Sequence, residues 1–318
     1  MVSISLSIII AFLVCVIISP VLIPFLRKLK FGQEILEIGP NWHKSKKGTP
    51  TMGGISFIFA ITFSILFIHL DLTGYIVFAF ALICGIIGFV DDFIKVHLKR
   101  NMGFNAKQKT MCLILAIVIF VLLLRYLNIT DTKIFIPFLK AEVEFSYFYY
   151  PLVLVGIFYM VNSVNLTDGI DGLCGSVTSI VLVFYVITLY MKNAVGLSYL
   201  SASALGAMIA FLIFNLHPAK MFMGDTGSLF LGGLVTGIAV ATGNPLIIVL
   251  FGIIYVIESL SVVIQVTSFK LTGKRVFKMS PIHHHFEMCG FSENKIVLLF
   301  SLVTFVFSVI GFFGTISL

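Results

Sequence analysis

Long apolar runs separated by short polar segments follow one another along the whole chain. A helix needs about 20 mostly apolar residues to cross the hydrocarbon core of a bilayer. Runs of roughly that scale begin near Ser3, Gly53, Gly74, Lys107, Pro151, Leu173, Leu197, Gly227, Pro245 and Ile296. The pattern predicts an all-α integral membrane protein with about ten transmembrane helices. Because no connection is long enough to fold separately, residues 1–318 are expected to form a single polytopic transmembrane domain.

Composition supports the same class. The chain is 59% hydrophobic and only 11% charged, and its mean hydropathy is +1.11. A fold with a water-exposed surface all round needs more polar residues than this. The first apolar run has no basic stretch before it and is followed by Arg27, Lys28 and Lys30. We therefore expect a retained helix that enters from outside, not a cleaved signal peptide.

The basic residues orient the predicted bundle. All but four of the 21 Lys and Arg residues fall in the loops of one side; the exceptions are Arg125, Lys133, Lys140 and Lys192. The positive-inside rule places the rich side in the cytoplasm and both termini on the periplasmic or extracellular side. The net charge is +7, and the basic residues lie in short loops beside the spans, where they contact membrane lipid headgroups. Nucleic-acid binding is not expected.

One external loop has the pattern of a small hairpin. Between Lys133 and Phe148, the chain has Ile134, Phe135 and Ile136 and then an alternation with apolar side chains at Val143, Phe145 and Tyr147. Alternation with a period of two is typical of a half-buried strand. We predict a β-hairpin lying on the external membrane surface.

Five aspartates gather where apolar runs meet the cytoplasmic loops: Asp91, Asp92, Asp168, Asp171 and Asp225. The first two are adjacent at the end of the third span. There they face the negative end of the helix dipole and raise each other's proton affinity. Because this arrangement costs stability, it indicates that Asp91 and Asp92 have a function. The alternative interpretation is an ordinary solvated helix terminus. The predicted active site is therefore cytoplasmic.

The other three aspartates stand in glycine-containing segments. In N-L-T-D-G-I-D-G-L, Asp168 and Asp171 are three residues apart, a spacing that on a helix brings both carboxylates to one face. In M-F-M-G-D-T-G-S, Asp225 is expected at a helix N-terminus. Each segment is also compatible with simple N-capping, with Thr167 as a further candidate in the first. The functional alternative for Asp225 is a Mg²⁺ site, since this ion prefers carboxylate, water and phosphate oxygens.

Histidines and lysines supply groups that suit phosphates. His283, His284 and His285 stand in P-I-H-H-H-F-E, within a basic loop. Three consecutive residues rarely converge on one metal, so phosphate contacts are favoured over a zinc site. Two lysine groups, in the segment 44–54 and at positions 107 and 109, suit phosphates equally but are also ordinary positive-inside loops. Glu258 lies inside the ninth run, where packing and function remain alternatives.

Several motifs together resemble a known family. They are N-W-H-K-S-K-K-G-T-P-T-M-G-G from Asn41, F-V-D-D from Phe89, N-L-T-D-G-I-D-G-L from Asn165, F-M-G-D-T-G-S from Phe222 and P-I-H-H-H-F-E from Pro281. In this order they are similar to the phospho-N-acetylmuramoyl-pentapeptide transferases. The resemblance implies a multi-pass enzyme of the bacterial cell (inner) membrane. It would use Mg²⁺ to transfer phospho-N-acetylmuramoyl-pentapeptide from its UDP-linked form to undecaprenyl phosphate, giving lipid I and UMP in peptidoglycan synthesis.

The resemblance also implies residue roles. The catalytic residues would be Asp91, Asp92, Asp225, His284 and His285, with Asp225 as the metal ligand. Substrate binding would fall to Lys44, Thr49, Lys95, Lys107, Lys109, Asn165, Asp168, Asp171, Asn215, Phe222, Gln265 and His283. Among these, Phe222 would stack on uracil. Two departures from the family pattern, Ile170 for leucine and Phe291 for tryptophan, remove no polar group.

Other functions stay open from the sequence. A related transferase that uses UDP-N-acetylglucosamine shares the aspartate motifs, although the long segments from Lys46 and Pro281 favour the muramoyl enzyme. A secondary transporter would account for Glu258, but the acids gather at one surface and not at the midplane. A structural scaffold gives no reason for the clustered acids and histidines. Direct attack, a covalent aspartyl-phosphate route and a homodimer are all compatible with the chain.

Overall fold

The fold is almost entirely helical. The computed structural model describes residues 2–29, 48–97 and 103–316. Its helices are α1 (Val2–Lys28), α2 (Gly54–Phe67), α3 (Leu72–His97), α4 (Ala106–Tyr126), α5 (Tyr149–Thr167), α6 (Leu173–Met191), α7 (Val195–Asn215), α8 (Gly224–Ala241), α9 (Ile247–Phe251), α10 (Ile253–Thr272), α11 (Ile282–Met288) and α12 (Glu293–Thr315).

The prediction of an all-α membrane protein is confirmed. Within the described ranges, nine helices are long and apolar enough to cross a bilayer. The second predicted span is shorter, because α2 has only 14 residues, which corresponds to about 21 Å of helix. The ninth predicted span is divided at Gly252, where the backbone leaves helical geometry between α9 and α10.

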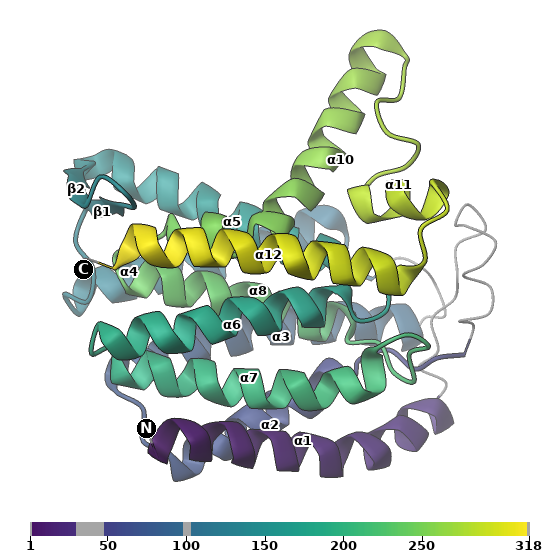
Figure 1. Ribbon diagram of the computed structural model, residues 1–318, viewed down its shortest axis with the longest axis horizontal. Helices are drawn as coiled ribbons and strands as arrows, with labels where there is room; N and C mark the ends of the chain where they lie inside the picture. Colours follow the sequence, from purple (N-terminus) through teal and green to yellow (C-terminus); the bar gives the residue numbers. More distant parts are fainter. Residues whose placement is uncertain (1, 30–47, 98–102, 317–318) are drawn as a thin grey trace.

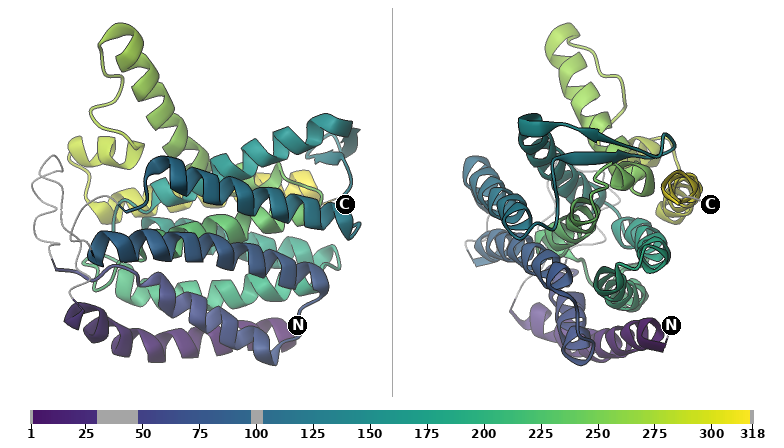
Figure 2. Two further views of the ribbon diagram at one scale, coloured as in Figure 1. Left: turned by 180° about the vertical axis from the view of Figure 1, so that it is seen from behind. Right: turned by 90° about the vertical axis from the view of Figure 1, so that its left-hand side faces the viewer.

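The long helices run side by side along one direction, and α10 turns away from them (Figure 1). The described chain begins and ends at the same end of this bundle (Figures 1 and 2). Because successive helices run up and down, the polar ends of α3, α5 and α7 and the beginnings of α4, α6, α8 and α12 meet at the opposite end. That end carries the five aspartates.

Helix α8 occupies the interior of the bundle. The most apolar 18-residue window of α8 is 89% buried, compared with 22% for α1, whose Ile17 and Val21 are exposed. In a bilayer such exposed apolar faces are in contact with lipid. Small residues let α8 approach α3 closely: a Cβ on Gly233 would lie 2.9 Å from the Cys84 sulfur. Backbone contact of this kind is typical of helix pairs in membranes.

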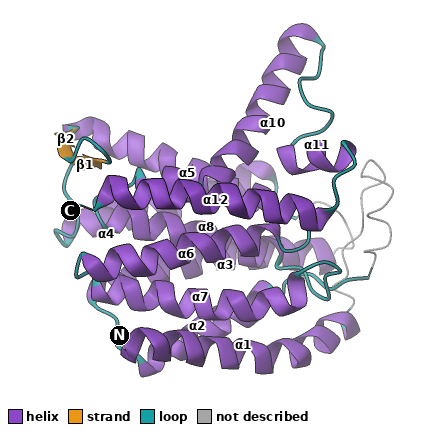
Figure 3. Cartoon of the chain, in the orientation of Figure 1, coloured by secondary structure: helices purple, strands orange, loops and turns teal. Residues whose placement is uncertain are grey.

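The predicted hairpin is present. Strands β1 (Lys133–Ile136) and β2 (Ala141–Glu144) pair antiparallel, with Ile134 opposite Val143. These are the only strands in the described ranges, and they lie at the end of the bundle where the described chain begins and ends (Figures 2 and 3). The Thr132 hydroxyl and the Ser146 N–H both donate to Glu144 and lower the pKa of that carboxyl.

Candidate active site

The polar end of the bundle gathers carboxylates and lysines from several helices. Asp225 is the second residue of α8, and its side chain receives three donors. Lys95 Nζ and Lys109 Nζ lie 2.7 and 2.9 Å from Asp225 Oδ2, and Asn165 Nδ2 donates to Oδ1 at 2.8 Å. Lysines and an amide from α3, α4 and α5 therefore converge on one acid at the start of α8.

Asp91 and Asp92 complete this group, which we call the carboxylate cluster: Asp91, Asp92 and Asp225 with Lys95 and Lys109. Asp91 Oδ2 lies 2.6 Å from Lys95 Nζ and 3.8 Å from Lys109 Nζ. Asp92 Oδ2 instead accepts from the backbone N–H and the hydroxyl of Thr226, at 2.9 and 2.7 Å. The two adjacent acids thus have different surroundings: Asp91 has the short contact with Lys95, whereas Asp92 lies 3.8 Å from Lys95 Nζ and holds the start of α8.

Glycines permit this close meeting of helix ends. A Cβ on Gly88 of α3 would lie 2.1 Å from the Asp225 carbonyl oxygen, so only glycine fits between the two backbones. Gly224 has φ of +71°, a conformation that side chains rarely adopt, and leads directly into Asp225. The positions of the carboxylates therefore depend on backbone contact between α3 and α8.

The segment before α2 is joined to the segment before α8 by backbone hydrogen bonds. Phe222 N–H donates to Pro50 O at 2.9 Å, Gly53 N–H to Phe222 O at 2.8 Å and Gly54 N–H to Met223 O at 3.0 Å. A Cβ on Gly54 would lie 2.4 Å from the Gly227 Cα, which explains the small residues here. Two motifs far apart in sequence form one structural unit beside the carboxylate cluster.

Asp168 and Asp171 do not share a helix face, and that prediction is wrong. Residues 168–172 form a turn between α5 and α6, so the helical spacing rule does not apply. The capping alternatives fail as well, since α6 starts after Gly172 and α8 after Met223, both without a side-chain cap. Burial, together with the charges of Asp225, Asp92 and Asp171, raises the pKa of Asp168 well above its usual range.

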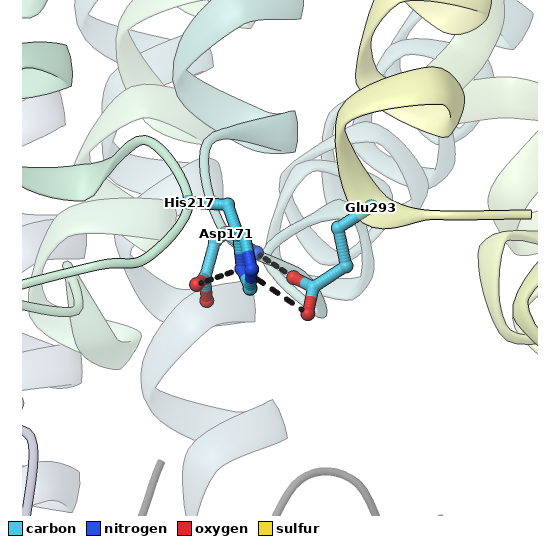
Figure 4. A group of neighbouring side chains, drawn as sticks. All are labelled: Asp171, His217 and Glu293. Atoms are coloured by element: carbon cyan, nitrogen blue, oxygen red, sulfur yellow. Dashed lines mark hydrogen bonds and ion pairs between the residues drawn. The ribbon is translucent and has the colours of Figure 1, made fainter. Parts of the chain in front are cut away.

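Asp171 instead forms a second polar group with two residues that sequence reasoning missed. His217 Nδ1 lies 3.0 Å from Asp171 Oδ2 and 3.6 Å from Glu293 Oε1 (Figure 4). The Asp171 N–H donates to Glu293 Oε2 at 2.9 Å, and Ala219 N–H donates to Asp171 Oδ2 at 3.0 Å. The turn is thus fixed to the loop after α7 and to the start of α12. In the sequence, His217 and Glu293 gave only weak signals, because one histidine in a loop and one acid in a first helical turn are common.

The three histidines point to different partners, so they do not form one metal site. His283 Nδ1 lies 3.0 Å from Glu258 Oε2, and both residues are fully buried. His284 Nδ1 lies 2.6 Å from Glu287 Oε2. His285 Nδ1 accepts from the Lys278 N–H at 3.2 Å. An unpaired acid in a membrane span costs about 2.5–3.5 kcal/mol. The contact with His283 reduces this cost for Glu258.

The remaining predicted binding residues are spread around this end. Asn215 is buried and joins Gly172 N–H to Met221 O. Gln265 accepts from Val276 and Phe277 N–H groups in the loop after α10, and thereby orders that loop. Phe222 and Thr49 are half-buried, and Lys107 is exposed. Lys44 lies outside the described residues. The substrate-binding and catalytic roles of all these residues stay predictions.

The carboxylate cluster fits a divalent cation by its chemistry. One oxygen from each of Asp91, Asp92 and Asp225 lies within 4.8 Å of the others. Hard carboxylate oxygens are the ligands that Mg²⁺ prefers. Lys95 and Lys109 leave the cluster with one more negative than positive charge if every group is ionised. Excess negative charge on hard donors suits a cation.

The two lysines of the predicted pair are expected to differ in function. Lys109 contacts Asp225 with its side chain only 20% exposed, whereas Lys107 is exposed in the first turn of α4. Removal of a preorganised charge at a reaction centre costs about 10²–10³ in turnover. We expect Lys109→Met to lower turnover about 100-fold and at least tenfold more than Lys107→Met, measured as the catalytic rates of both purified variants. Equal losses would remove the special role of Lys109.

Comparison with known proteins identifies the class and then the family. Residues 73–243 match glycosyl transferase family 4, and residues 46–58 match the first signature of the phospho-N-acetylmuramoyl-pentapeptide transferases. With nine membrane helices in its described part and a polar cluster at one end, the chain is a multi-pass membrane transferase.

Curated relatives match almost end to end. One from Halalkalibacterium halodurans is 44% identical over 97% of this chain and 96% of its own length. Another from Clostridium perfringens (strain 13) is 48% identical over 97% and 98%. A third from Thermoanaerobacter sp. (strain X514) is 46% identical over 98% of both. All are named phospho-N-acetylmuramoyl-pentapeptide-transferase, and this chain belongs to that family.

Proposed function

We propose that this chain transfers phospho-N-acetylmuramoyl-pentapeptide from UDP-N-acetylmuramoyl-pentapeptide to undecaprenyl phosphate, giving lipid I and UMP. The observation that carries the proposal is the carboxylate cluster at the polar end of a membrane bundle. A lipid phosphate is confined to the bilayer edge, and a nucleotide arrives from water, so reacting groups belong at helix ends. We place this end on the cytoplasmic side of a bacterial inner membrane and treat residues 1–318 as one domain.

Mg²⁺ is the proposed cofactor, held by Asp225 with Asp91 and Asp92 beside it. Both substrates bring negative phosphates to a cluster that already has excess negative charge, and two lysines cannot neutralise them all. When bound, the ion would neutralise phosphate oxygens and the charge that develops on the leaving UMP. Lys95 and Lys109 supply fixed positive charge in the same place and keep the carboxylates oriented.

We propose direct attack by the lipid phosphate. Its oxygen forms a bond to the sugar-linked phosphorus of the diphosphate, and the bond from that phosphorus to the oxygen of UMP breaks. Phosphoryl transfer depends mainly on positioning and charge stabilisation, which the cluster supplies without a covalent step. In this proposal Asp91, with one oxygen in the lysine network, would orient the attacking phosphate and accept any proton it carries.

A burst experiment separates the one-step from the covalent route. With the UDP-linked substrate and Mg²⁺ but no lipid acceptor, we expect no rapid release of UMP. A covalent aspartyl-phosphate route would release about one equivalent of UMP per enzyme before stopping. Rapid-quench measurement over the first turnovers distinguishes the two, and a stoichiometric burst would overturn direct attack.

The adjacent acids are expected to give different defects. Asp92→Ala leaves the buried N–H and hydroxyl of Thr226 without their acceptor, so it should cost about 1–3 kcal/mol of stability as well as activity. Asp91→Asn keeps an acceptor for the Phe104 N–H and should lower UMP release with little change in melting temperature. Thermal denaturation in detergent beside the activity assay checks this. Equal melting temperatures for the two variants would contradict the assignment.

The function itself is tested by UMP release from the purified protein with undecaprenyl phosphate and Mg²⁺. UDP-N-acetylmuramoyl-pentapeptide is compared with UDP-N-acetylglucosamine, each with and without EDTA. We expect turnover of the muramoyl substrate alone and its loss in EDTA. Turnover of the glucosamine substrate alone would reject the proposed substrate, and turnover that survives EDTA would reject the metal.

A further inference from the structure

One buried acid–histidine pair lies against the turn that carries Asp168 and takes no part in the proposed reaction steps. Glu258, in α10, and His283, in α11, are both 0% exposed. Their contact, 3.0 Å between Glu258 Oε2 and His283 Nδ1, joins two helices that are 25 residues apart. One of the two groups must donate across this contact; with Glu258 ionised, the donor is the Nδ1–H of the imidazole.

The other nitrogen of the ring faces the aspartate turn. His283 Nε2 is buried and has no hydrogen-bond partner among the described residues. A Cβ placed on Gly169 would lie 2.1 Å from this nitrogen and 2.5 Å from the neighbouring Cε1. The ring therefore lies directly against Gly169, the residue after Asp168. Glu258 and Gly169 hold the imidazole from opposite sides.

We propose that Glu258 is a positioning residue: it fixes the Nδ1-protonated form of His283 and presents Nε2 to the turn that carries Asp168. The inference rests on the proposed function, in which an anionic diphosphate reaches this end of the bundle. A carboxylate partner on one imidazole nitrogen fixes the tautomer and the orientation of the ring. Without Glu258, the nitrogen facing the turn is no longer specified.

Two features make this arrangement more than packing. Buried polar atoms in folded proteins almost always have partners, so an unpartnered Nε2 in a fully buried ring is an exception that needs an explanation. The glycine is the second feature, because position 169 accepts no side chain while His283 keeps its contact with Glu258. The two motifs P-I-H-H-H-F-E and N-L-T-D-G-I-D-G-L meet at this one point.

Histidine nitrogen NMR tests the proposal without any need for turnover. Protein labelled with ¹⁵N-histidine in nanodiscs is compared with Glu258→Ala and Gly169→Ala, and the His283 signals are assigned by their loss in His283→Gln. In the parent protein we expect a protonated Nδ1 that couples to its hydrogen. In Glu258→Ala we expect this signal to be lost or exchanged for protonated Nε2, the form favoured without a partner. Gly169→Ala should shift the same signals by displacing the ring.

A double-mutant cycle measures whether Glu258 acts through His283. We expect Glu258→Ala to lower turnover about 10- to 100-fold, as removal of a supporting acid often does. The double variant Glu258→Ala/His283→Gln should then be no slower than His283→Gln alone within about threefold. Glu258→Gln keeps an acceptor without the charge and should recover part of the loss.

A matched control comes from another part of the bundle. Ser308 of α12 is fully buried, and its hydroxyl donates to Phe251 O at 3.2 Å. Ser308→Ala removes a buried polar contact elsewhere and should leave the His283 signals unchanged. An unprotonated Nδ1 in the parent protein would overturn the inference. So would a double variant whose loss of turnover equals the product of the losses of the two single variants. The NMR result does not depend on activity. Failure of the proposed reaction is detected separately, by the UMP-release assay of the parent enzyme.

Discussion

Asp225→Asn is expected to reduce UMP release by about 10³-fold or more while the protein stays folded. The side chain is the meeting point of Lys95, Lys109 and Asn165, each with a nitrogen within 2.9 Å of one of its oxygens. Asparagine has nearly the same shape but lacks the charge that would hold Mg²⁺ and balance the two ammonium groups. Loss of electrostatic stabilisation at a reaction centre is the largest single effect in many enzymes.

The measurement is UMP release across a Mg²⁺ titration, with a melting curve of the same preparation. We expect Asp225→Asn to remain inactive at every Mg²⁺ concentration and to melt within a few degrees of the parent protein. An asparagine variant with ordinary turnover would exclude Asp225 as the essential ligand. Asp131→Asn, beside the hairpin at the opposite end of the bundle, provides a matched change of charge far from the cluster.

Gly88→Ala is expected to cause the second large loss, through the backbone. The new methyl carbon would lie 2.1 Å from the Asp225 carbonyl oxygen, so α3 and α8 must separate. Overpacking of this kind costs about 1–3 kcal/mol or more, and it moves Asp225 away from both Asp91 and Lys95. We expect a lower melting temperature and a loss of turnover that Mg²⁺ does not restore.

Gly156→Ala is the matched control for this substitution. Gly156 is an exposed helical glycine of α5, and a Cβ there meets nothing within 4 Å. Alanine in an open helical position is about 1 kcal/mol more favourable than glycine in water, so this variant should be at least as stable as the parent. A Gly88→Ala protein that melts and turns over like the Gly156→Ala protein would contradict the close contact.

Hydropathy predicted the helices well because the bilayer imposes one length and one composition on every span. It located α1, α3 and α12, and period-two alternation located the hairpin. It did not predict the short α2 or the break at Gly252, since both depend on neighbouring helices and not on local composition. Apolar content alone does not show where a helix leaves the bundle, as α10 does (Figure 1).

The sequence located the acids of the candidate site but not their partners. Asp91, Asp92 and Asp225 were expected together because helix ends on one side of a membrane must meet at one surface, and the structure brings them together. Asp168 and Asp171 were placed on one helix face, but the chain turns there, and Asp171 joins His217 and Glu293 instead. Thr226 and Gly88 gave no signal either, because contacts between distant segments are not visible in local spacing.

The backbone hydrogen bonds between the segment before α2 and the segment before α8 have a consequence for hydrogen exchange. The amides of Gly53, Gly54 and Phe222 all donate to carbonyl oxygens across this junction. Amide protons held in this way exchange with deuterium only when the junction opens. Although they lie at the polar end of the bundle, these three amides should retain their protons much longer than the amides of exposed loop residues that donate no hydrogen bond. Their exchange rates would report, without any substrate, how often the wall beside the carboxylate cluster comes apart.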